Sequence, residues 1–232
     1  MILKSVMSWK VVTLFLLVLP IQANTQTLEE YIEKGRHCFN VKGAFDSSIH
    51  YATLAIGQDS NYSFAYYLRA FSTVRQNKVV ISKALPDIQK AITLNPDRAD
   101  YYDLRGFIYD YLGKYPLALQ DYNKAIGIEP EFARAYYHRG VTYVSLEDYK
   151  SALADLNLSI ELDSTSDMVF FKRGIVFMIL KQNQKSLNDF SRCIRLNKNY
   201  ADAYYNRGVI YDEQENYDKA LVEYNKAYKL DQ

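Results

Sequence analysis

The sequence predicts an all-α protein, a right-handed superhelical solenoid of about six helix–turn–helix repeats. The first observation is a period of 34 residues between four glycines, each preceded by an arginine: Gly106, Gly140, Gly174 and Gly208. The second is that large and small residues keep fixed places around these glycines. The third is that an arginine and an acidic residue recur together along the chain. Repeats of this length stack into one continuous core, so they present a long surface and not a catalytic pocket.

The packing positions become clear when each glycine is counted as slot 8 of its repeat. Slots 4 and 11 hold large residues: Tyr102, Tyr136, Phe170 and Tyr204, then Tyr109, Tyr143, Phe177 and Tyr211. Slots 20 and 27 hold small ones: Ala118, Ala152, Ser186 and Ala220, then Ala125, Ser159, Cys193 and Ala227. Slots 4, 8 and 11 follow the three- to four-residue spacing of one helix face. The pattern predicts two closely packed antiparallel helices in each repeat.

The first residues of the chain, 1–23, do not follow this pattern. Lys4 and Lys10 mark a basic start, and residues 11–19 form a short apolar run. This is the layout of a secretory signal peptide, for which we expect cleavage after Ala23. The apolar run is short for a membrane span, and an uncleaved anchor is the alternative. The sequence therefore predicts an exported protein, periplasmic or secreted.

The solenoid is expected to cover residues 24–232, with two degenerate repeats before the four regular ones. The first repeat keeps Tyr31 and Gly35, and has one extra residue in its turn. The second keeps Tyr66 and Ala84, and has two extra residues. The expected repeats are 28–62, 63–98, 99–132, 133–166, 167–200 and 201–232.

From the second repeat onward, slot 7 is an arginine and slot 23 is a carboxylate. In an antiparallel hairpin that turns near slot 15, these slots lie at the same height, and a guanidinium fork fits a carboxylate. We expect five ion pairs within repeats: Arg69–Asp87, Arg105–Asp121, Arg139–Asp155, Arg173–Asp189 and Arg207–Glu223. The alternative is an arginine row that holds an anionic ligand. The acid in every copy favours the structural pairing.

The slot pattern resembles the tetratricopeptide repeat family, and residues 203–231, AYYNRGVIYDEQENYDKALVEYNKAYKLD, match it closely. The resemblance implies a concave groove lined by the first helix of each repeat, which binds a protein or peptide. The family's clamp for chaperone C-termini needs lysine at slot 5 and asparagine at slot 9. Those slots are aromatic, aliphatic or acidic in this chain, so that clamp is not expected.

The groove positions carried over from the family give an apolar and aromatic middle. The expected partner-binding residues are Tyr67, Tyr137, Val141, Met168, Phe171, Ile175, Met178 and Tyr205. Acidic residues are expected on one side (Asp100, Asp103 and Asp110) and on the other (Asp202, Asp212 and Glu213). We expect an apolar segment with basic flanks to dock there. The alternative is that tight curvature, or the N-terminal tail, buries these side chains.

Composition argues against several other classes of function. A formal net charge of +1 gives no basic footprint for nucleic acid. The three histidines show no metal-ligand spacing, and the glycines lie at helix-packing slots and not in a phosphate loop. No nucleophile has a base beside it, so we expect no enzyme, no cofactor, no metal and no small-molecule substrate. Cys38 and Cys193 are several repeats apart, which is beyond disulfide reach.

The sequence therefore predicts an exported, non-catalytic protein–protein interaction scaffold, with a role in cell-envelope or pilus assembly. A secreted factor that acts on a host cell through the same groove is the alternative. A second contact surface is expected on the last helix, where Leu221, Tyr224 and Tyr228 would otherwise meet a seventh repeat. These side chains are expected either to pack inward or to form a surface for self-association or for a partner.

Overall fold

The structure is a computed structural model that describes residues 26–41, 43–76 and 78–231. Those residues form twelve α-helices and one short 3-10 helix, and they contain no strand. The helices are α1 (Leu28–Asn40), α2 (Phe45–Gln58), α3 (Ser63–Gln76), η1 (Lys78–Ala84), α4 (Leu85–Leu94), α5 (Ala99–Tyr111), α6 (Tyr115–Ile128), α7 (Ala133–Ser145), α8 (Tyr149–Leu162), α9 (Asp167–Ile179), α10 (Asn183–Leu196), α11 (Ala201–Glu213) and α12 (Tyr217–Leu230). The predicted all-α repeat solenoid is confirmed. The predicted signal segment, 1–23, lies outside the described residues.

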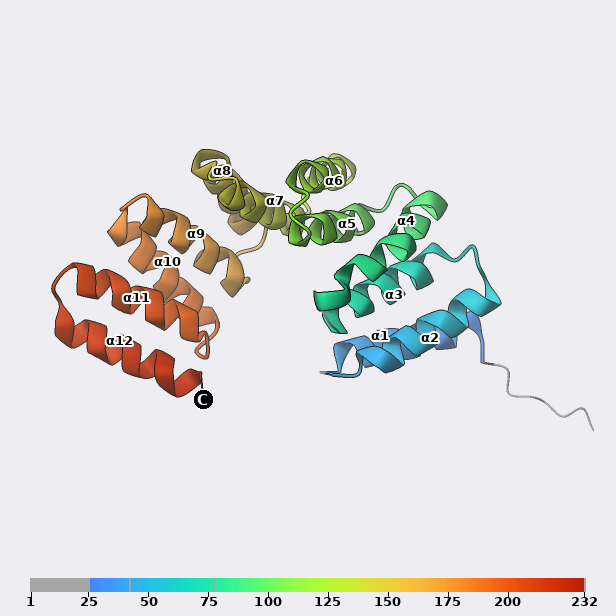
Figure 1. Cartoon of the computed structure of the whole chain (residues 1–232), viewed down its shortest axis with the longest axis horizontal. Coiled ribbons are helices and arrows are strands. Elements are labelled where there is room, and N and C mark those ends of the chain that lie inside the picture. Colours follow the sequence, from blue (N-terminus) through green and yellow to red (C-terminus); the bar gives the residue numbers. More distant parts are fainter. Residues whose placement is uncertain (1–25, 42, 77, 232) are drawn as a thin grey trace, which may run out of the picture.

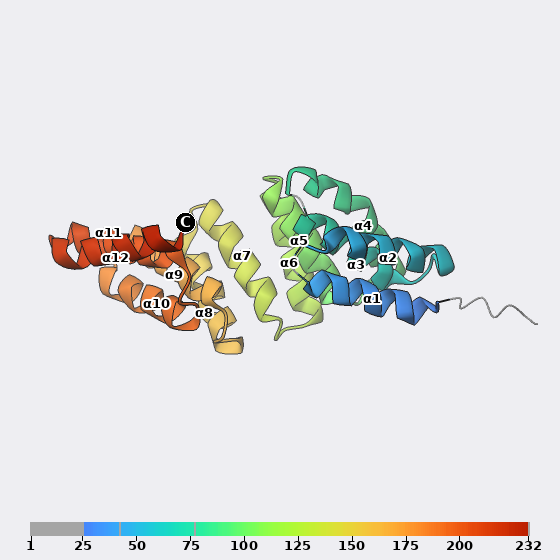
Figure 2. The ribbon, with the colours of Figure 1, turned by 90° about the horizontal axis from the view of Figure 1, so that it is seen from below.

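Consecutive helices pair in antiparallel fashion, and the pairs follow one another along an arch (Figure 1). Figure 2 shows the same order along the long axis, from α1 at one end to α12 at the other. Each first helix contacts the next first helix, from α1 with α3 to α9 with α11. Among the described residues, no second helix contacts the next second helix. The arch therefore curves toward the first helices, which form its concave side.

The two helices of a pair come closest at the slot 8 glycine. A Cβ atom added to Gly106 would lie 2.7 Å from the ring of Tyr122, and one added to Gly174 would lie 2.8 Å from the ring of Phe190. Tyr122 and Phe190 come from slot 24 of the second helix and are fully buried. The glycine therefore supplies the space into which the large aromatic side chain packs.

The turn inside each regular repeat is closed in the same way. Its slot 15 residue has a positive φ, which is 70° at Gly113, 59° at Glu147, 56° at Lys181 and 60° at Glu215. The next residue donates its backbone N–H to the slot 11 carbonyl, at 2.8 Å where Lys114 bonds Tyr109. This is the bonding of a Schellman motif, which ends a helix in a left-handed residue.

The second repeat departs from the regular pattern at the place where the sequence has its two extra residues. Its turn contains the 3-10 helix η1, which leads directly into α4. Ile81 and Ala84 are buried and anchor this turn, and Pro86 occupies the first turn of α4. A proline there loses no helical hydrogen bond, since that N–H has no partner within the helix. The extra residues are therefore accommodated without a change in the helix pairing.

Candidate partner-binding groove

The structure contains all five arginine–carboxylate pairs expected within the repeats. In the third repeat, Arg105 donates from Nε and Nη2 to the two carboxylate oxygens of Asp121, at 2.8 and 2.6 Å. The closest contacts of the other four are all 2.7 Å: Arg69–Asp87, Arg139–Asp155, Arg173–Asp189 and Arg207–Glu223. These side chains are mostly buried inside the helix pairs, so the arginine row is part of the scaffold and not an open anion site.

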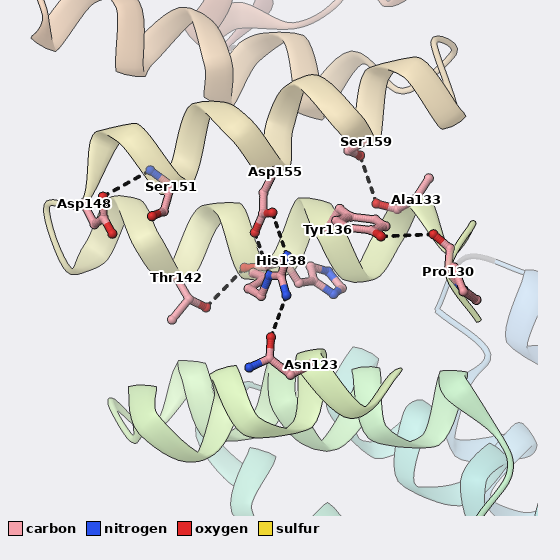
Figure 3. Close-up of polar contacts among 11 residues, drawn as sticks. Asn123, Pro130, Ala133, Tyr136, His138, Thr142, Asp148, Ser151, Asp155 and Ser159 are labelled. Carbon is pink, nitrogen blue, oxygen red and sulfur yellow. Dashed lines mark hydrogen bonds and ion pairs between the residues drawn. The ribbon is translucent and has the colours of Figure 1, made fainter. Parts of the chain in front are cut away.

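Each of these arginines also reaches the preceding repeat, which the sequence reading missed. Nη1 of Arg139 donates to Asn123 of α6 at 2.6 Å, while Nε of the same guanidinium donates to Asp155 of α8 at 2.7 Å (Figure 3). The equivalent acceptors, one repeat apart, are Thr53, Gln89, Asn123, Asn157 and Ser191. A polar residue recurring at slot 25 was the available signal. The arginine therefore joins three helices.

The ion pair of the last repeat has a different geometry. Glu223 replaces the aspartate found in the other pairs, and both of its carboxylate oxygens accept from Nη2 of Arg207, at 2.7 and 2.9 Å. Nε of Arg207 is buried and has no hydrogen-bond partner among the described residues. The longer glutamate side chain thus loses the two-pronged geometry of the aspartates.

Six of the eight residues expected to bind a partner are exposed or partly buried, and they lie on three successive first helices, which form the concave side. We call this the groove surface: Tyr137 and Val141 of α7, Met168, Ile175 and Met178 of α9, and Tyr205 of α11. Met168 is 49% exposed and Tyr205 is 55% exposed, while the other four are partly buried. Ile179, at slot 13 of α9, is 43% exposed and continues the same apolar strip. The sequence reading did not single out Ile179.

Two of the eight expected residues are buried, which corrects the sequence prediction. Tyr67 is 7% exposed, because its ring stacks on Tyr101 with 5.0 Å between centroids. Phe171 is 9% exposed, because it packs against Tyr200 at 4.9 Å and against Phe190 at 5.8 Å. Tight packing between neighbouring repeats therefore removes both side chains from the surface, as the alternative reading proposed.

The acidic residues expected on the N-terminal side of the groove are not free to bind a partner, which also corrects the sequence prediction. Asp103 is 2% exposed and accepts from Nε of Arg134 at 2.8 Å and from Nδ1 of His138 at 2.7 Å. Asp110 accepts from the hydroxyl of Thr142 at 2.6 Å. We call these five residues the polar junction between α5 and α7. The carboxylates of Asp103 and Asp110 accept hydrogen bonds from α7, so these two residues do not form an open acidic flank for a partner.

Asp100 is likewise engaged, in a two-bond pair with Arg98. Three acids of α11, in contrast, are exposed beside the groove surface: Asp202, Asp212 and Glu213. Of these, Glu213 accepts from Lys181 at 3.1 Å. The carboxylates available to a bound partner are therefore gathered on the C-terminal side.

Other chemistry is sparse in the described part of the chain. Both cysteines are free, and burial raises the pKa of the Cys193 thiol to about 12, which keeps it unreactive at neutral pH. Among the described residues, no cluster of three or more possible metal ligands occurs. No described helix has both the length and the apolar character needed to cross a membrane.

Comparisons with known proteins agree with this geometry. A model described as TPR repeat matches residues 108–147, and models described as tetratricopeptide repeat match 133–166 and 201–232. No match was found among curated proteins. YrrB, described as a TPR protein with an unusual peptide-binding site, is 28% identical, with a TM-score of 0.57, over 77% of this chain and 91% of YrrB.

Two further solved structures share the fold. PilF of Pseudomonas aeruginosa is 15% identical, with a TM-score of 0.73, over 84% of this chain and 88% of PilF. A tetratricopeptide repeat protein of Parabacteroides merdae is 23% identical, with a TM-score of 0.64, over 87% of this chain and 79% of that protein. At these identities the likeness concerns architecture alone.

Proposed function

We propose, from the premise that this chain belongs to the tetratricopeptide repeat family, that its groove surface binds an apolar segment of another protein. The family and the fold support a protein–protein interaction scaffold, and such proteins are generally non-catalytic. The observation that carries the proposal is the exposure of large apolar side chains on the concave side, above all Met168 and Tyr205. An exposed apolar strip bordered by charge is typical of an interaction site.

The surroundings of the strip indicate the chemistry of the bound segment. Tyr137 is neutral at pH 7, and burial raises its pKa further, to about 12. The one cation at a groove slot of α7, Arg134, is paired with Asp103. The α11 side carries the exposed carboxylates of Asp202 and Asp212. A segment with apolar residues next to lysine or arginine complements both parts. The peptide-binding site described for YrrB supports a peptide ligand for a chain of this kind.

The test compares two labelled peptides of the same apolar sequence, one ending in lysines and the other in glutamates. We expect the lysine peptide to bind the full chain more tightly by fluorescence anisotropy. Met168→Ser combined with Tyr205→Ala should weaken that binding at least about 10-fold, because the variant loses apolar contacts that desolvate on binding and adds no charge that could attract the lysines.

The matched control is Leu146→Ser, since Leu146 is 46% exposed but lies at the turn that follows α7. This variant should bind the lysine peptide like the native chain. Equal affinity of the native chain and the groove variant would refute binding at this surface. Equal binding of the two peptides would refute the role of the α11 carboxylates.

The place of action is a second part of the proposal and depends on residues 1–23. Their signal-peptide layout supports export, followed by a scaffold role in cell-envelope or pilus assembly. Fractionation of the producing cells should find the chain, shortened at its N-terminus, in the periplasm or envelope. Recovery from the culture medium would favour the factor acting on a host cell, and an intact N-terminus in the cytoplasm would contradict export.

A further inference from the structure

Helix α12 presents the most exposed apolar face of the described residues. Four of its large apolar side chains are the most exposed of that kind: Tyr217 (64%), Leu221 (61%), Val222 (66%) and Tyr228 (69%). Tyr224, by contrast, packs inward, with its ring over Gly208 and 5.5 Å from the ring of Tyr205. The expected inward packing therefore applies to Tyr224 alone, while Leu221 and Tyr228 face outward.

The earlier repeats show what this face is built to contact. Leu221 occupies slot 21 and Tyr228 occupies slot 28. The equivalent residues are all apolar and all buried or partly buried: Ile49, Leu85, Leu119, Leu153 and Leu187 at slot 21, and Ile56, Ile92, Ile126, Ile160 and Ile194 at slot 28. In the fifth repeat, for example, they form one cluster with Ala203 and Ile210 of the next first helix. The face of α12 therefore has the composition of a helix-docking face.

The opposite end of the arch has a different composition. First helices dock on the preceding repeat through slots 3 and 10, whose residues are buried: Ala65, Tyr101, Ala135, Val169 and Ala203, then Ser72, Ile108, Thr142, Val176 and Ile210. In α1 these slots are Glu30 and His37, and both side chains are exposed. A second copy cannot stack its α1 on α12 without burying a charged side chain there. Burial of Glu30 therefore disfavours a head-to-tail contact through α1, whereas a contact between two α12 faces buries no acid of α1.

The charges on the α12 face match an arrangement about a two-fold axis. Asp218 and Lys229 are both exposed, and their 11-residue separation, about three helical turns, places them on one face at opposite ends. Asn225 lies between them. When two such helices run antiparallel, Asp218 of each copy faces Lys229 of the other, and the apolar residues between them meet. The two helix dipoles are then antiparallel, which is an attractive arrangement.

We propose that two copies of this protein associate tail to tail through an antiparallel α12–α12 contact. Both copies use the same face of α12, related by a two-fold axis, as an isologous dimer requires. One helix pair buries less than the roughly 800 Å² per partner of a standard interface, so the dimer is weak and forms at micromolar concentration. The contact lies on α12 and uses none of the groove-surface residues, so it leaves the groove open in both copies.

Analytical ultracentrifugation of the full chain over a concentration range tests the contact. We expect a monomer of 27.0 kDa that converts to a dimer, with no larger species. Leu221→Lys should raise the dimer Kd at least about 10-fold. The control Leu146→Lys, which changes a residue of similar chemistry at a distant turn, should dimerise like the native chain. A native chain that stays monomeric, or association that survives Leu221→Lys, would overturn the proposal.

A charge exchange tests the antiparallel geometry. Asp218→Lys places two lysines on the face and Lys229→Asp places two aspartates there, so each variant alone should be monomeric. An equimolar mixture should recover the dimer, because each lysine then meets an aspartate of the other copy. A dimer formed by either variant alone, or a mixture that stays monomeric, would refute the pairing. All four substitutions are at exposed positions, and circular dichroism confirms that each variant is folded.

Discussion

Replacing both hydrogen-bond donors of Asp103 is expected to lower the free energy of unfolding by about 3–5 kcal/mol at neutral pH. The variant combines Arg134→Met with His138→Phe, which keep most of the side-chain volume. Asp103 is 2% exposed, and among the described residues no other side chain donates a hydrogen bond to its carboxylate. Without them a carboxylate remains buried and uncompensated, and this state costs more than the lost pair interactions themselves. Urea denaturation followed by circular dichroism measures the loss.

The pH dependence of this loss has a definite sign. In the native protein burial alone would raise the pKa of Asp103, but His138 and Arg134 outweigh it and hold the pKa below its ordinary value. That stabilisation is present above the unfolded-state pKa, about 4, and is lost as pH falls through the folded-state pKa. In the double variant burial acts alone, so the pKa of Asp103 rises and protonation relieves the buried charge. The difference in stability should therefore shrink between about pH 7 and about pH 4.

A third substitution separates charge from shape. Adding Asp103→Leu to the double variant removes the orphaned carboxylate and should restore most of the lost stability, since an apolar replacement of a whole buried network is close to neutral. Arg98→Met is the surface control, because Arg98 is 45% exposed in its pair with Asp100. This substitution should lower the free energy of unfolding by less than about 1 kcal/mol. A triple variant as unstable as the double one would attribute the loss to packing.

The repeat architecture could be predicted because each of its elements depends on residues close in sequence. The glycine at slot 8 and the large apolar or aromatic residue at slot 24 lie on the two helices of one hairpin, and so do the arginine at slot 7 and the acid at slot 23. A fixed period brings the same partners together each time. Among the described residues, the four regular helix pairs begin at Ala99, Ala133, Asp167 and Ala201.

The groove was harder to predict because its exposure depends on contacts between repeats. Phe171 and Ile175 occupy groove slots of the same helix, yet only Phe171 is covered, by Tyr200 from the connection that follows α10. The polar junction shows the same limit. An isolated aspartate at slot 5, with basic residues at slots 2 and 6 of the next repeat, was the signal for Asp103, Arg134 and His138. Reading each repeat by itself could not join residues that belong to two repeats.

Gly106→Ala is expected to lower the free energy of unfolding by about 2 kcal/mol, although alanine favours helix formation more than glycine. The new Cβ would lie 2.7 Å from the ring of Tyr122, and that ring is fully buried and cannot swing aside. The helices α5 and α6 must therefore separate, which costs packing along the whole pair. The urea midpoint measures the overall loss, and hydrogen exchange should show it in the amides of α5 and α6.

Two other glycines provide the comparison that identifies the cause. Gly127 is helical and an added Cβ meets nothing within 4 Å, so Gly127→Ala should stabilise the chain by about 0.5–1 kcal/mol. Gly208 faces Tyr224 at 2.8 Å, but that ring is only partly buried, so Gly208→Ala should cost less than Gly106→Ala. If Gly106→Ala were as stable as the native chain, the close approach at slot 8 would not set the distance between the helices. An equal loss at Gly106 and Gly208 would instead show that the freedom of the facing ring does not matter.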